Sequence, residues 1–317
     1  MRVALLDVAI SQAPRLSRLV GFPLDVVKPA DGRQTVDAVI ALRFGRTEAD
    51  RYLTRLVHLP GAGADAIDTA VLAPNCTVCN VFEHEVPVAE YVLTAILDHA
   101  LSYGKMTRDF SSDRWSETYS TRRPHGEIRG KILGLLGYGH IGKAVAQRAR
   151  AFGMAVHAIS RSGRAAEADW SGDASRLHEM LAVVDFLVIA CPLTADTRGL
   201  IGARELDLLK PSAVLINIGR AQIVEEEPLF RSLEAGRLAG ATLDVWYQYP
   251  AAGDVHARPS RFAFDRLPNV SCTAHSSAWT EELFERRYAV IADNLTRLRE
   301  DRPLRNVIHA ASEIRIA

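Results

Sequence analysis

Residues 131–152, KILGLLGYGHIGKAVAQRARAF, decide the fold of this chain. The apolar run 132–136 predicts a buried strand, and the residues after Gly142 have the apolar spacing of a helix. Of the three glycines between them, Gly137 permits a tight turn, Gly139 lets a pyrophosphate approach the backbone, and Gly142 lets the helix pack on the strand. The stretch predicts a dinucleotide site where backbone amides and the helix dipole hold phosphates. The alternative is a glycine-rich turn in an α/β domain without a ligand.

The next expected strand, residues 154–160, ends in Ser160, Arg161 and Ser162. A carboxylate at this position would accept from the 2′-hydroxyl of the adenine ribose and would repel a 2′-phosphate. A guanidinium and two hydroxyls have the opposite preference, because they donate to phosphate oxygens. We therefore expect NADP to be preferred, with NAD possible and with Arg164 as a weaker second contact. Alternatively, Arg161 is a solvated arginine that stacks on adenine.

Short β-branched runs alternate with helical patterns along most of the chain, which predicts two doubly wound α/β domains with parallel sheets and crossover helices. The cleft between two such domains is the default site. The expected strands of the first set are residues 2–8, 24–29, 37–44, 56–60 and 77–81, and those of the second set are 131–137, 154–160, 185–190, 212–218, 238–245 and 269–274. Helical patterns include residues 47–56, 88–106 and 281–300.

Composition excludes several classes of function. The 317 residues contain 38 Lys and Arg and 38 Asp and Glu, so no basic field for nucleic acid is expected. No apolar run reaches the roughly 18 residues of a membrane span, and residues 1–12 fit a first strand better than a signal peptide. Four cysteines are too few for a disulfide framework, and Cys76 and Cys79 lack a second pair that would complete a zinc site. We expect a cytoplasmic protein without a metal.

The chain resembles the D-isomer-specific 2-hydroxyacid dehydrogenases, the family of glyoxylate/hydroxypyruvate reductases and phosphoglycerate dehydrogenase. The matching stretches, which cover most of residues 57–290 in the family's order, are VAEYVLTAIL, GEIRGKILGLLGYGHIGKAVAQ, ACPLTADTRGLIG, LINIGRAQIVEEEPL, GATLDVW and PNVSCTAHSSAWT. The resemblance implies a Rossmann dinucleotide-binding domain, residues 99–286, inserted in a flavodoxin-like substrate domain, residues 1–98 and 287–317. It also implies a homodimer and hydride transfer between a nicotinamide and C2 of a small 2-oxo or 2-hydroxy acid.

The resemblance assigns the substrate contacts residue by residue. Arg220 in NIGRAQ holds the substrate's carboxylate and carbonyl oxygen, which suits a planar guanidinium fork. His275 in TAHSSAW is the proton donor, a task that imidazole performs near neutral pH. The backbone amides of Ala62 and Gly63, in the loop PGAGAD, form a small anion nest, and Asn80 lies near the substrate.

Further cofactor contacts follow from the same resemblance. Asp244, at the end of GATLD, binds the nicotinamide carboxamide. Within the glycine motif itself, His140 occupies a variable position and is expected to contribute through its backbone rather than as a catalyst. The other positions expected to line the cofactor are Ile141, Cys191, Pro192, Thr197, Ile218 and Ser277.

The chain departs from its apparent family in LDVWYQYP. The family has a glutamate five residues after the position of Asp244, and that carboxylate pairs with the catalytic histidine. Here that position is Tyr249. A neutral phenol provides a hydrogen bond and a weaker electrostatic bias, so we expect a less basic His275 and keto-acid reduction that falls off earlier as pH rises. Alternatively, Tyr249 packs as an aromatic wall, or a neighbour approaches the histidine instead. The candidate neighbours are Tyr247, Gln248 and Asp254.

Two classes of function remain open. The preferred one is an NADP-dependent oxidoreductase of a small 2-oxo acid such as glyoxylate or hydroxypyruvate, because both Arg220 and His275 are present. The other is a non-catalytic dinucleotide-sensing protein or corepressor. A further enzymatic alternative is a dehydrogenase of an unusual donor such as formate or phosphite.

Overall fold

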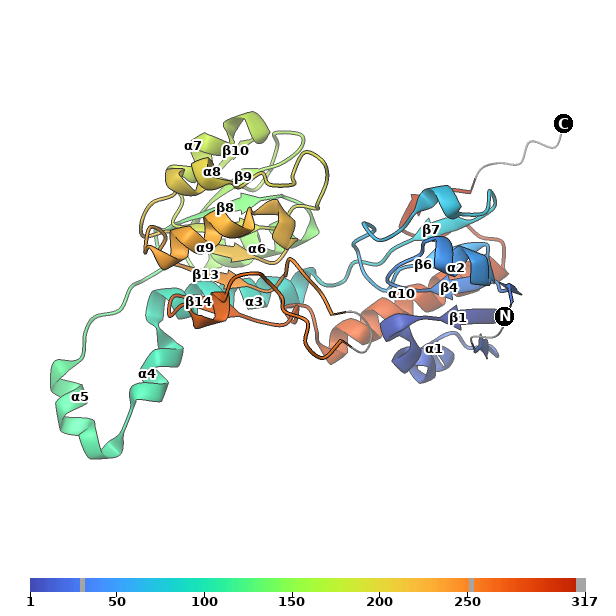
Figure 1. Ribbon diagram of the computed structural model, residues 1–317, viewed down its shortest axis with the longest axis horizontal. Coiled ribbons are helices and arrows are strands. Elements are labelled where there is room, and N and C mark those ends of the chain that lie inside the picture. The colour runs from blue at the N-terminus through green and yellow to red at the C-terminus, as the bar shows by residue number, and fades with distance from the viewer. Residues whose placement is uncertain (29–31, 251–253, 312–317) are drawn as a thin grey trace. The chain divides into compact units, whose positions relative to one another are not determined.

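The computed structural model describes residues 1–28, 32–250 and 254–311. The chain forms two compact units, Met1–Glu83 with Thr280–Ala317 and His84–Trp279. Each unit contains its own mostly parallel sheet with helices packed against it (Figure 1), which confirms the expected α/β fold. None of the helices in the described part combines the length and apolar content that crossing a membrane requires.

The units divide immediately before two helices, α3 (Glu85–Leu101) and α10 (Glu281–Arg299). The boundaries expected from the sequence, after residues 98 and 286, fall inside these helices. All of α3 lies in the second unit, where its apolar side chains share a core with those of α6 (His140–Ala151). All of α10 lies in the first unit.

The second unit is built on a seven-stranded sheet in which all neighbouring strands are parallel. Its strands are β8 (Ile132–Leu136), β9 (Ala155–Ile159), β10 (Trp170–Gly172), β11 (Phe186–Ile189), β12 (Val214–Asn217), β13 (Gly240–Leu243) and β14 (Val270–Cys272). The spatial order is β10-β9-β8-β11-β12-β13-β14, so the direction of winding reverses between β8 and β11. In open α/β sheets, ligands bind beyond the carboxyl ends of the strands at such a reversal.

Both faces of this sheet are covered, as the near-continuous apolar strands require. Leu133 and Leu135 of β8 pack with α3 and α6, whereas the alternate residue Leu136 joins the core on the other face. That face is covered by α7 (Leu177–Leu181), α8 (Ala203–Leu208) and α9 (Glu226–Glu234). The 3-10 helices of this unit are η3 (Ser112–Arg114), η4 (Ala174–Arg176), η5 (Ala221–Ile223) and η6 (Phe264–Arg266).

The first unit contains a six-stranded sheet in the order β15-β7-β6-β4-β1-β2. Its strands are β1 (Arg2–Leu5), β2 (Asp25–Val27), β4 (Ala38–Ile40), β6 (Leu56–His58), β7 (Thr77–Cys79) and β15 (Val307–His309). Only β15 is antiparallel among these described strands, and it adds the end of the chain to the edge of the sheet. One face packs on α1 (Ala13–Leu19) and α10, and the other on α2 (Arg46–Arg51). The unit also contains η1 (Asp7–Gln12) and η2 (Thr69–Val71).

The helix expected over residues 47–56 is wrong in its second half. The helix α2 ends at Arg51, and the next two residues form β5 (Tyr52–Leu53). This strand pairs in parallel with β3 (Gln34–Thr35), so a tertiary contact overrides the local helical pattern.

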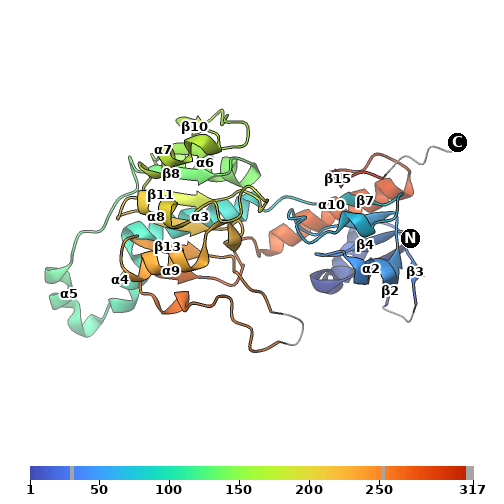
Figure 2. The same cartoon turned by 45° about the horizontal axis from the view of Figure 1, so that its top comes forward.

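The helix expected over residues 88–106 is also interrupted. Ser102 adopts a left-handed backbone conformation with φ of 55°, which ends α3 before α4 (Tyr103–Asp109) begins. Residues 102–126, here called the arm, continue through α5 (Trp115–Thr121) and return to the end of α3. The Gly126 amide donates to the Ala100 carbonyl oxygen at 3.0 Å and closes the base of the arm. In Figures 1 and 2 the arm lies away from the seven-stranded sheet.

Candidate active site

The glycine turn after β8 has the geometry that a pyrophosphate site needs. A Cβ on Gly137, whose φ is +109°, would lie 2.6 Å from the Cys191 amide nitrogen. A Cβ on Gly142 would lie 2.4 Å from the Gly137 carbonyl oxygen. By contrast, a Cβ on Gly139 would meet nothing within 4 Å in the described structure. The first and third glycines are therefore needed for the fold, whereas the second leaves the backbone open to a ligand.

The turn after β9 presents the expected cation. The Ser160 hydroxyl donates to the Arg164 carbonyl oxygen at 2.9 Å, and the Gly163 amide donates to the Ser160 carbonyl oxygen at 3.1 Å. These bonds fix a tight turn in which Arg161 and Ser162 are exposed. Among the residues that the structure describes, no carboxylate or hydrogen-bond acceptor engages the Arg161 guanidinium. Its five donors are therefore available to an anionic ligand.

The loops after β11 and β12 provide apolar and backbone surfaces at the same edge of the sheet as the glycine turn after β8. Ile218 is buried, and Cys191 is largely covered. Burial raises the pKa of the Cys191 thiol to about 11, so this side chain is a neutral wall at physiological pH. The Thr197 hydroxyl donates to the Pro192 carbonyl oxygen at 2.7 Å and fixes the loop. Because β8, β11 and β12 are parallel neighbours, these loops meet at one edge of the sheet.

Arg220 follows β12 and is positioned by the side chain of Asn217. The buried Asn217 accepts from the Gly219 amide and donates to the Arg220 carbonyl oxygen, both at 3.1 Å. Arg220 Nη1 donates to the Gly219 carbonyl oxygen at 2.9 Å. Sequence reasoning did not identify Asn217, although a polar residue at the end of the apolar run VLIN was a usable signal.

Asp244 holds the turn that carries His275. Its fully buried carboxylate accepts from the Ser276 amide at 2.7 Å, from the Ser277 amide at 3.0 Å and from the Thr273 hydroxyl at 2.6 Å. Between these donors, His275 has a left-handed backbone with φ of 57°, a conformation that an L-residue adopts only at a cost of order 1–3 kcal/mol. The carboxylate thus stabilises a strained backbone. The expected contact of Asp244 with the nicotinamide stays a prediction.

Two aromatic residues that the sequence did not single out extend this network. The Tyr91 hydroxyl of α3 lies 2.6 Å from the Thr273 hydroxyl, which itself donates to Asp244. Burial raises the pKa of Tyr91 to about 12, so it remains a neutral donor. The Trp246 indole donates to the Thr273 carbonyl oxygen at 2.8 Å.

Tyr249 reaches the histidine ring. Its hydroxyl lies 2.9 Å from His275 Nδ1 and accepts the Trp246 amide at 3.2 Å. The alternative Tyr247 instead donates its hydroxyl to the Val224 carbonyl oxygen at 2.9 Å. A further alternative, Asp254, accepts the amide of the exposed His256 at 3.0 Å.

The expected substrate loop lies in the first unit, after β6. Asn80, which is buried, donates from Nδ2 to the Ala62 carbonyl oxygen at 2.8 Å and so fixes the loop that contains Gly63. Within the described residues, Asn80 Oδ1 is buried and has no hydrogen-bond partner. The substrate-binding roles of these three residues stay predictions. The described residues contain no cluster of three His, Cys, Asp or Glu side chains that could hold a metal.

Known proteins share this sequence pattern. The family model of the D-isomer specific 2-hydroxyacid dehydrogenase, NAD binding domain, matches residues 93–277. The chain is 44% identical over 125 residues to a glyoxylate reductase of Thermococcus gammatolerans, a match that spans 39% of this chain but only 37% of that relative. It is 41% identical over 230 residues to a glyoxylate reductase of Thermococcus kodakarensis, with 68% of each chain covered.

Solved structures share the fold over almost the whole chain. A D-isomer specific 2-hydroxyacid dehydrogenase family protein from Aeromonas salmonicida has a TM-score of 0.75 and 26% identity, with 97% of this chain and 98% of that chain covered. An NADPH-dependent glyoxylate/hydroxypyruvate reductase from Sinorhizobium meliloti, in complex with NADP and sulfate, has a TM-score of 0.77 and 23% identity. It covers 97% of this chain and 98% of its own length.

Proposed function

Since this chain belongs to the D-isomer specific 2-hydroxyacid dehydrogenase family, we propose that it transfers hydride between NADP and C2 of a small 2-oxo or 2-hydroxy acid, such as glyoxylate or hydroxypyruvate. One observation carries the proposal: the open Gly139 turn, Arg220 and His275 follow the carboxyl ends of β8, β12 and β14. These strands are parallel, so the three features belong to one edge of the sheet. This edge is where an open α/β sheet binds its ligand.

The residues of this chain divide the chemistry among them. The Gly139 turn and the amides that begin α6 hold the pyrophosphate, and the bound nicotinamide supplies or accepts the hydride. Arg220 binds the substrate's carboxylate and polarises its carbonyl oxygen. His275 gives a proton to that oxygen during reduction and takes it back during oxidation. The amides of Ala62 and Gly63 bind the carboxylate as well.

NADP is the preferred cofactor in this proposal. Exposed Arg161, without a partner among the described residues, supports it, as does the absence of a carboxylate at the end of β9. A charge-assisted contact to the 2′-phosphate contributes roughly 1.5–3 kcal/mol, or about 10- to 100-fold in affinity. The structurally similar reductase of Sinorhizobium meliloti is NADPH-dependent and was solved with NADP, which agrees with this choice.

The decisive experiment is a screen of small 2-oxo acids with NADPH and with NADH. We expect reduction of at least one 2-oxo acid, with a higher kcat/KM for NADPH. Tight NADPH binding without turnover of any 2-oxo acid would favour a dinucleotide-sensing protein instead. Reduction of NADP by formate or by phosphite would favour the unusual-donor alternative.

Arg161→Ala tests the cofactor preference separately. It should lower kcat/KM for NADPH by about 10- to 100-fold and leave kcat/KM for NADH unchanged, so that NADH is the internal control. Unchanged NADPH affinity in this variant would reject Arg161 as the 2′-phosphate contact.

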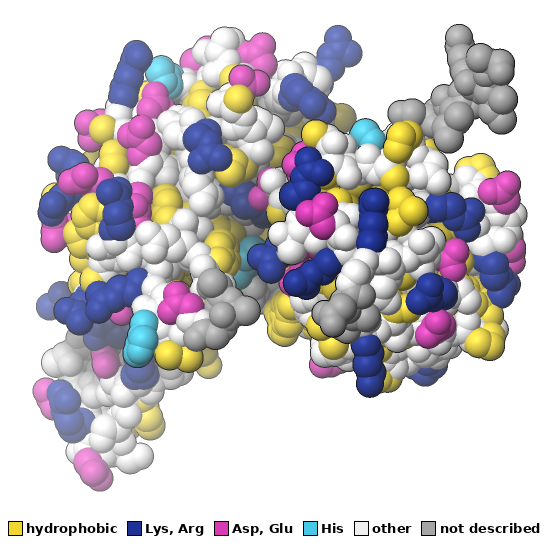
Figure 3. Space-filling model, turned by 45° about the vertical axis from the view of Figure 1, so that its right-hand side comes forward, with side chains coloured by type: hydrophobic (Ala, Val, Ile, Leu, Met, Phe, Trp, Pro, Cys, Tyr) yellow, Lys and Arg dark blue, Asp and Glu magenta, His cyan; other side chains and the backbone are white. Residues whose placement is uncertain are grey.

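The proposed enzyme acts as a homodimer. The arm supports this assembly, because five large hydrophobic side chains on it are 45–63% exposed: Tyr103, Met106, Phe110, Trp115 and Tyr119. Contiguous exposed apolar side chains of this kind mark protein interfaces. Elsewhere, Figure 3 shows Lys and Arg side chains interspersed with Asp and Glu across the visible face.

A further inference from the structure

The phenol of Tyr249 meets the ring of His275 through its hydroxyl. The Tyr249 oxygen lies 2.9 Å from His275 Nδ1, and the two ring centroids are 5.6 Å apart with an angle of 48° between the ring planes. Tilted rings at this separation make contact at their polar edges rather than face to face. Tyr249 is also 52% exposed, so burial of an aromatic wall does not account for its position.

The hydrogen bonds around the phenol oxygen indicate which atom carries the proton. A backbone amide can only donate, so the Tyr249 oxygen is the acceptor in its 3.2 Å bond from the Trp246 amide. A single hydrogen lies between the phenol oxygen and Nδ1, and it comes either from the phenol or from the ring. A phenol O–H is the stronger donor, and its oxygen, which already accepts one bond, is the weaker acceptor.

We infer that Tyr249 is a positioning residue that donates its hydroxyl hydrogen to Nδ1 of His275 and keeps the proton of the neutral imidazole on Nε2. A carboxylate in the same place could only accept, and it would require the hydrogen on Nδ1. Tyrosine at this position therefore selects the opposite tautomer. Nε2 of the neutral ring then donates a hydrogen bond toward the substrate's carbonyl oxygen. The proton given up in reduction leaves from the imidazolium, in which Nδ1 has gained a second proton and donates to the phenol oxygen, so that loss of the Nε2 proton leaves a neutral ring.

The histidine is held at two points in this arrangement. Asp244 fixes its backbone through the Ser276 and Ser277 amides, and Tyr249 fixes its ring. The catalytic consequence rests on the proposed function, whereas the tautomer itself does not.

The first test is nitrogen NMR of the full chain labelled with 15N-histidine, recorded well above the titration midpoint of the His275 ring. His275→Gln identifies the His275 signals among those of the 10 histidines. Wild type should show Nδ1 in the unprotonated range and Nε2 in the protonated range. Tyr249→Glu should move the proton to Nδ1, and Tyr249→Phe should give a mixture of the two tautomers. Circular dichroism checks that each variant is folded.

A kinetic test compares two tyrosine variants. Tyr249→Phe should lower kcat for 2-oxo acid reduction by about 10-fold or more, as loss of an outer partner of a catalytic histidine does, with KM for NADPH unchanged. Tyr247→Phe removes a hydroxyl from the same segment, but that hydroxyl bonds the Val224 carbonyl oxygen, so kcat should stay near wild type.

The NMR result decides the inference without any substrate. The inference is wrong if the neutral His275 ring of the wild-type protein carries its proton on Nδ1. It is also wrong if folded Tyr249→Phe has the same tautomer as wild type. Equal loss of kcat in the Tyr249→Phe and Tyr247→Phe enzymes also overturns it, since the effect would then come from the segment as a whole. A wild-type enzyme that reduces no 2-oxo acid contradicts the proposed function but leaves the tautomer assignment intact.

Discussion

Gly139 and Gly142 lie in the same turn, yet an added methyl group would meet opposite surroundings. At Gly142 it would lie 2.4 Å from a backbone carbonyl oxygen, which cannot move aside as a side chain can. Overpacking of this kind costs roughly 1–3 kcal/mol, which exceeds the gain of about 1 kcal/mol in helix propensity from glycine to alanine. Gly142→Ala should therefore lower the unfolding temperature, measured by differential scanning fluorimetry.

Gly139→Ala is the matched comparison. Its methyl group has open space and an ordinary backbone conformation, with φ of −87° and ψ of −154°. The unfolding temperature should stay near wild type, whereas the methyl group would occupy the space of the pyrophosphate. NADPH affinity, measured by fluorescence titration, should fall by about 10-fold or more. Loss of stability without loss of affinity would contradict the placement of the cofactor at this turn.

Arg220 and His275 should have different kinetic signatures. Arg220→Ala should raise KM for the 2-oxo acid and also lower kcat, because the guanidinium both binds the carboxylate and polarises the reacting carbonyl. His275→Ala should chiefly lower kcat, by about 10²- to 10⁴-fold, because proton transfer is lost. Both variants should bind NADPH as wild type does. Near wild-type turnover in either variant, with chemistry rate-limiting, is the outcome that contradicts its role.

At the residue scale, the sequence identified groups that belong to motifs and missed groups that act through distant contacts. Arg220 and His275 stand in recognisable motifs, and Tyr249 was visible as a departure from one. The bonds from Asp244 to Ser276 and Ser277 join residues 32 and 33 positions apart, and no local pattern encodes them. The Tyr91 hydroxyl, 182 positions from Thr273, was equally inaccessible to pattern reasoning.

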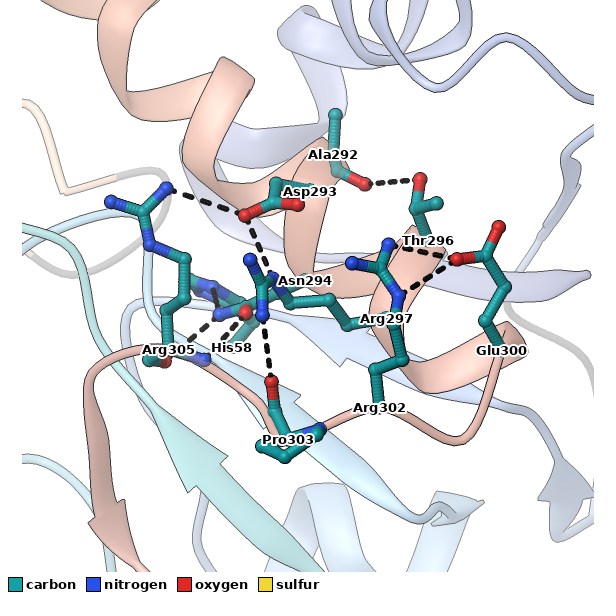
Figure 4. A network of polar contacts seen from close by, with 10 residues as sticks. All are labelled: His58, Ala292, Asp293, Asn294, Thr296, Arg297, Glu300, Arg302, Pro303 and Arg305. Carbon is teal, nitrogen blue, oxygen red and sulfur yellow. Dashed lines mark hydrogen bonds and ion pairs between the residues drawn. The ribbon is translucent and has the colours of Figure 1, made fainter.

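At the scale of elements, a buried polar network joins β6, α10 and the segment that precedes β15 (Figure 4). His58 is fully buried, donates from Nδ1 to the Leu59 carbonyl oxygen at 3.0 Å, and accepts from Asn294 Nδ2 at 2.9 Å. Asn294 also donates to the Arg305 carbonyl oxygen at 3.0 Å and accepts the Arg305 amide at 2.8 Å. Both ring nitrogens of His58 therefore have hydrogen-bond partners, and this arrangement requires the neutral imidazole because Nε2 must accept.

This network should make the first unit sensitive to acid. Burial lowers the pKa of His58 to about 4 from its ordinary value of 6.5. Above about pH 6.5 both folded and unfolded chains hold the ring neutral, so no stability is lost. Between about pH 6.5 and 4 only the unfolded chain takes up the proton. Stability should therefore fall with decreasing pH by about 1.4 kcal/mol per unit, or roughly 3 kcal/mol in all.

His58→Gln provides the control, because glutamine has a donor and an acceptor but does not titrate in this range. The variant should be less stable than wild type at pH 7, and its unfolding temperature should fall less between pH 7 and pH 5. Carboxylates titrate equally in both proteins, so their contribution cancels in the comparison. Parallel curves for the two proteins would show that His58 is not the group responsible.

Secondary structure was predictable where apolar runs are long enough to be buried on both faces. The runs at residues 131–137 and 212–218 each became a central strand, β8 and β12. The three-residue strands β10 and β15 were missed, because Trp170–Gly172 and Val307–His309 are too short to show a period and form only by pairing at a sheet edge. The break at Ser102 was missed because a left-handed serine has no distinctive sequence signal.

At the scale of the whole molecule, the chain passes from the first unit to the second and returns with α10. The helix α10 packs on α1 through Leu295 and Ile291 in one core with Leu16, so the first unit is assembled from both ends of the chain. A truncation before residue 280 should therefore leave the first unit unable to fold, while the second unit retains its own two cores. Limited proteolysis of residues 1–279, with NADPH as a protecting ligand, measures this: residues 1–83 should be digested and residues 84–279 should resist.

The arm should hold two copies of the chain together. Its aromatic side chains pack on one another. The ring centroids of Phe110 and Trp115 are 6.1 Å apart, and those of Trp115 and Tyr119 are 5.3 Å apart. The Arg122 guanidinium lies 3.9 Å from the centroid of the Tyr119 ring. A preformed aromatic surface loses little side-chain entropy on association, and aromatic residues dominate interface energies. We expect a homodimer in size-exclusion chromatography with light scattering, at protein concentrations of about 10 μM, well above the dissociation constant of a typical stable interface.

Trp115→Asp should shift this equilibrium toward the monomer, because a charge would have to be desolvated in the proposed interface. The variant should remain folded, since the base of the arm is closed by the Ala100 and Gly126 backbone bond rather than by Trp115, which is 53% exposed. Val255→Asp is the control: Val255 is 85% exposed but lies outside the arm, so this variant should remain dimeric. A monomeric wild type, or a Trp115→Asp protein that dimerises as well as Val255→Asp, is incompatible with an arm-mediated dimer.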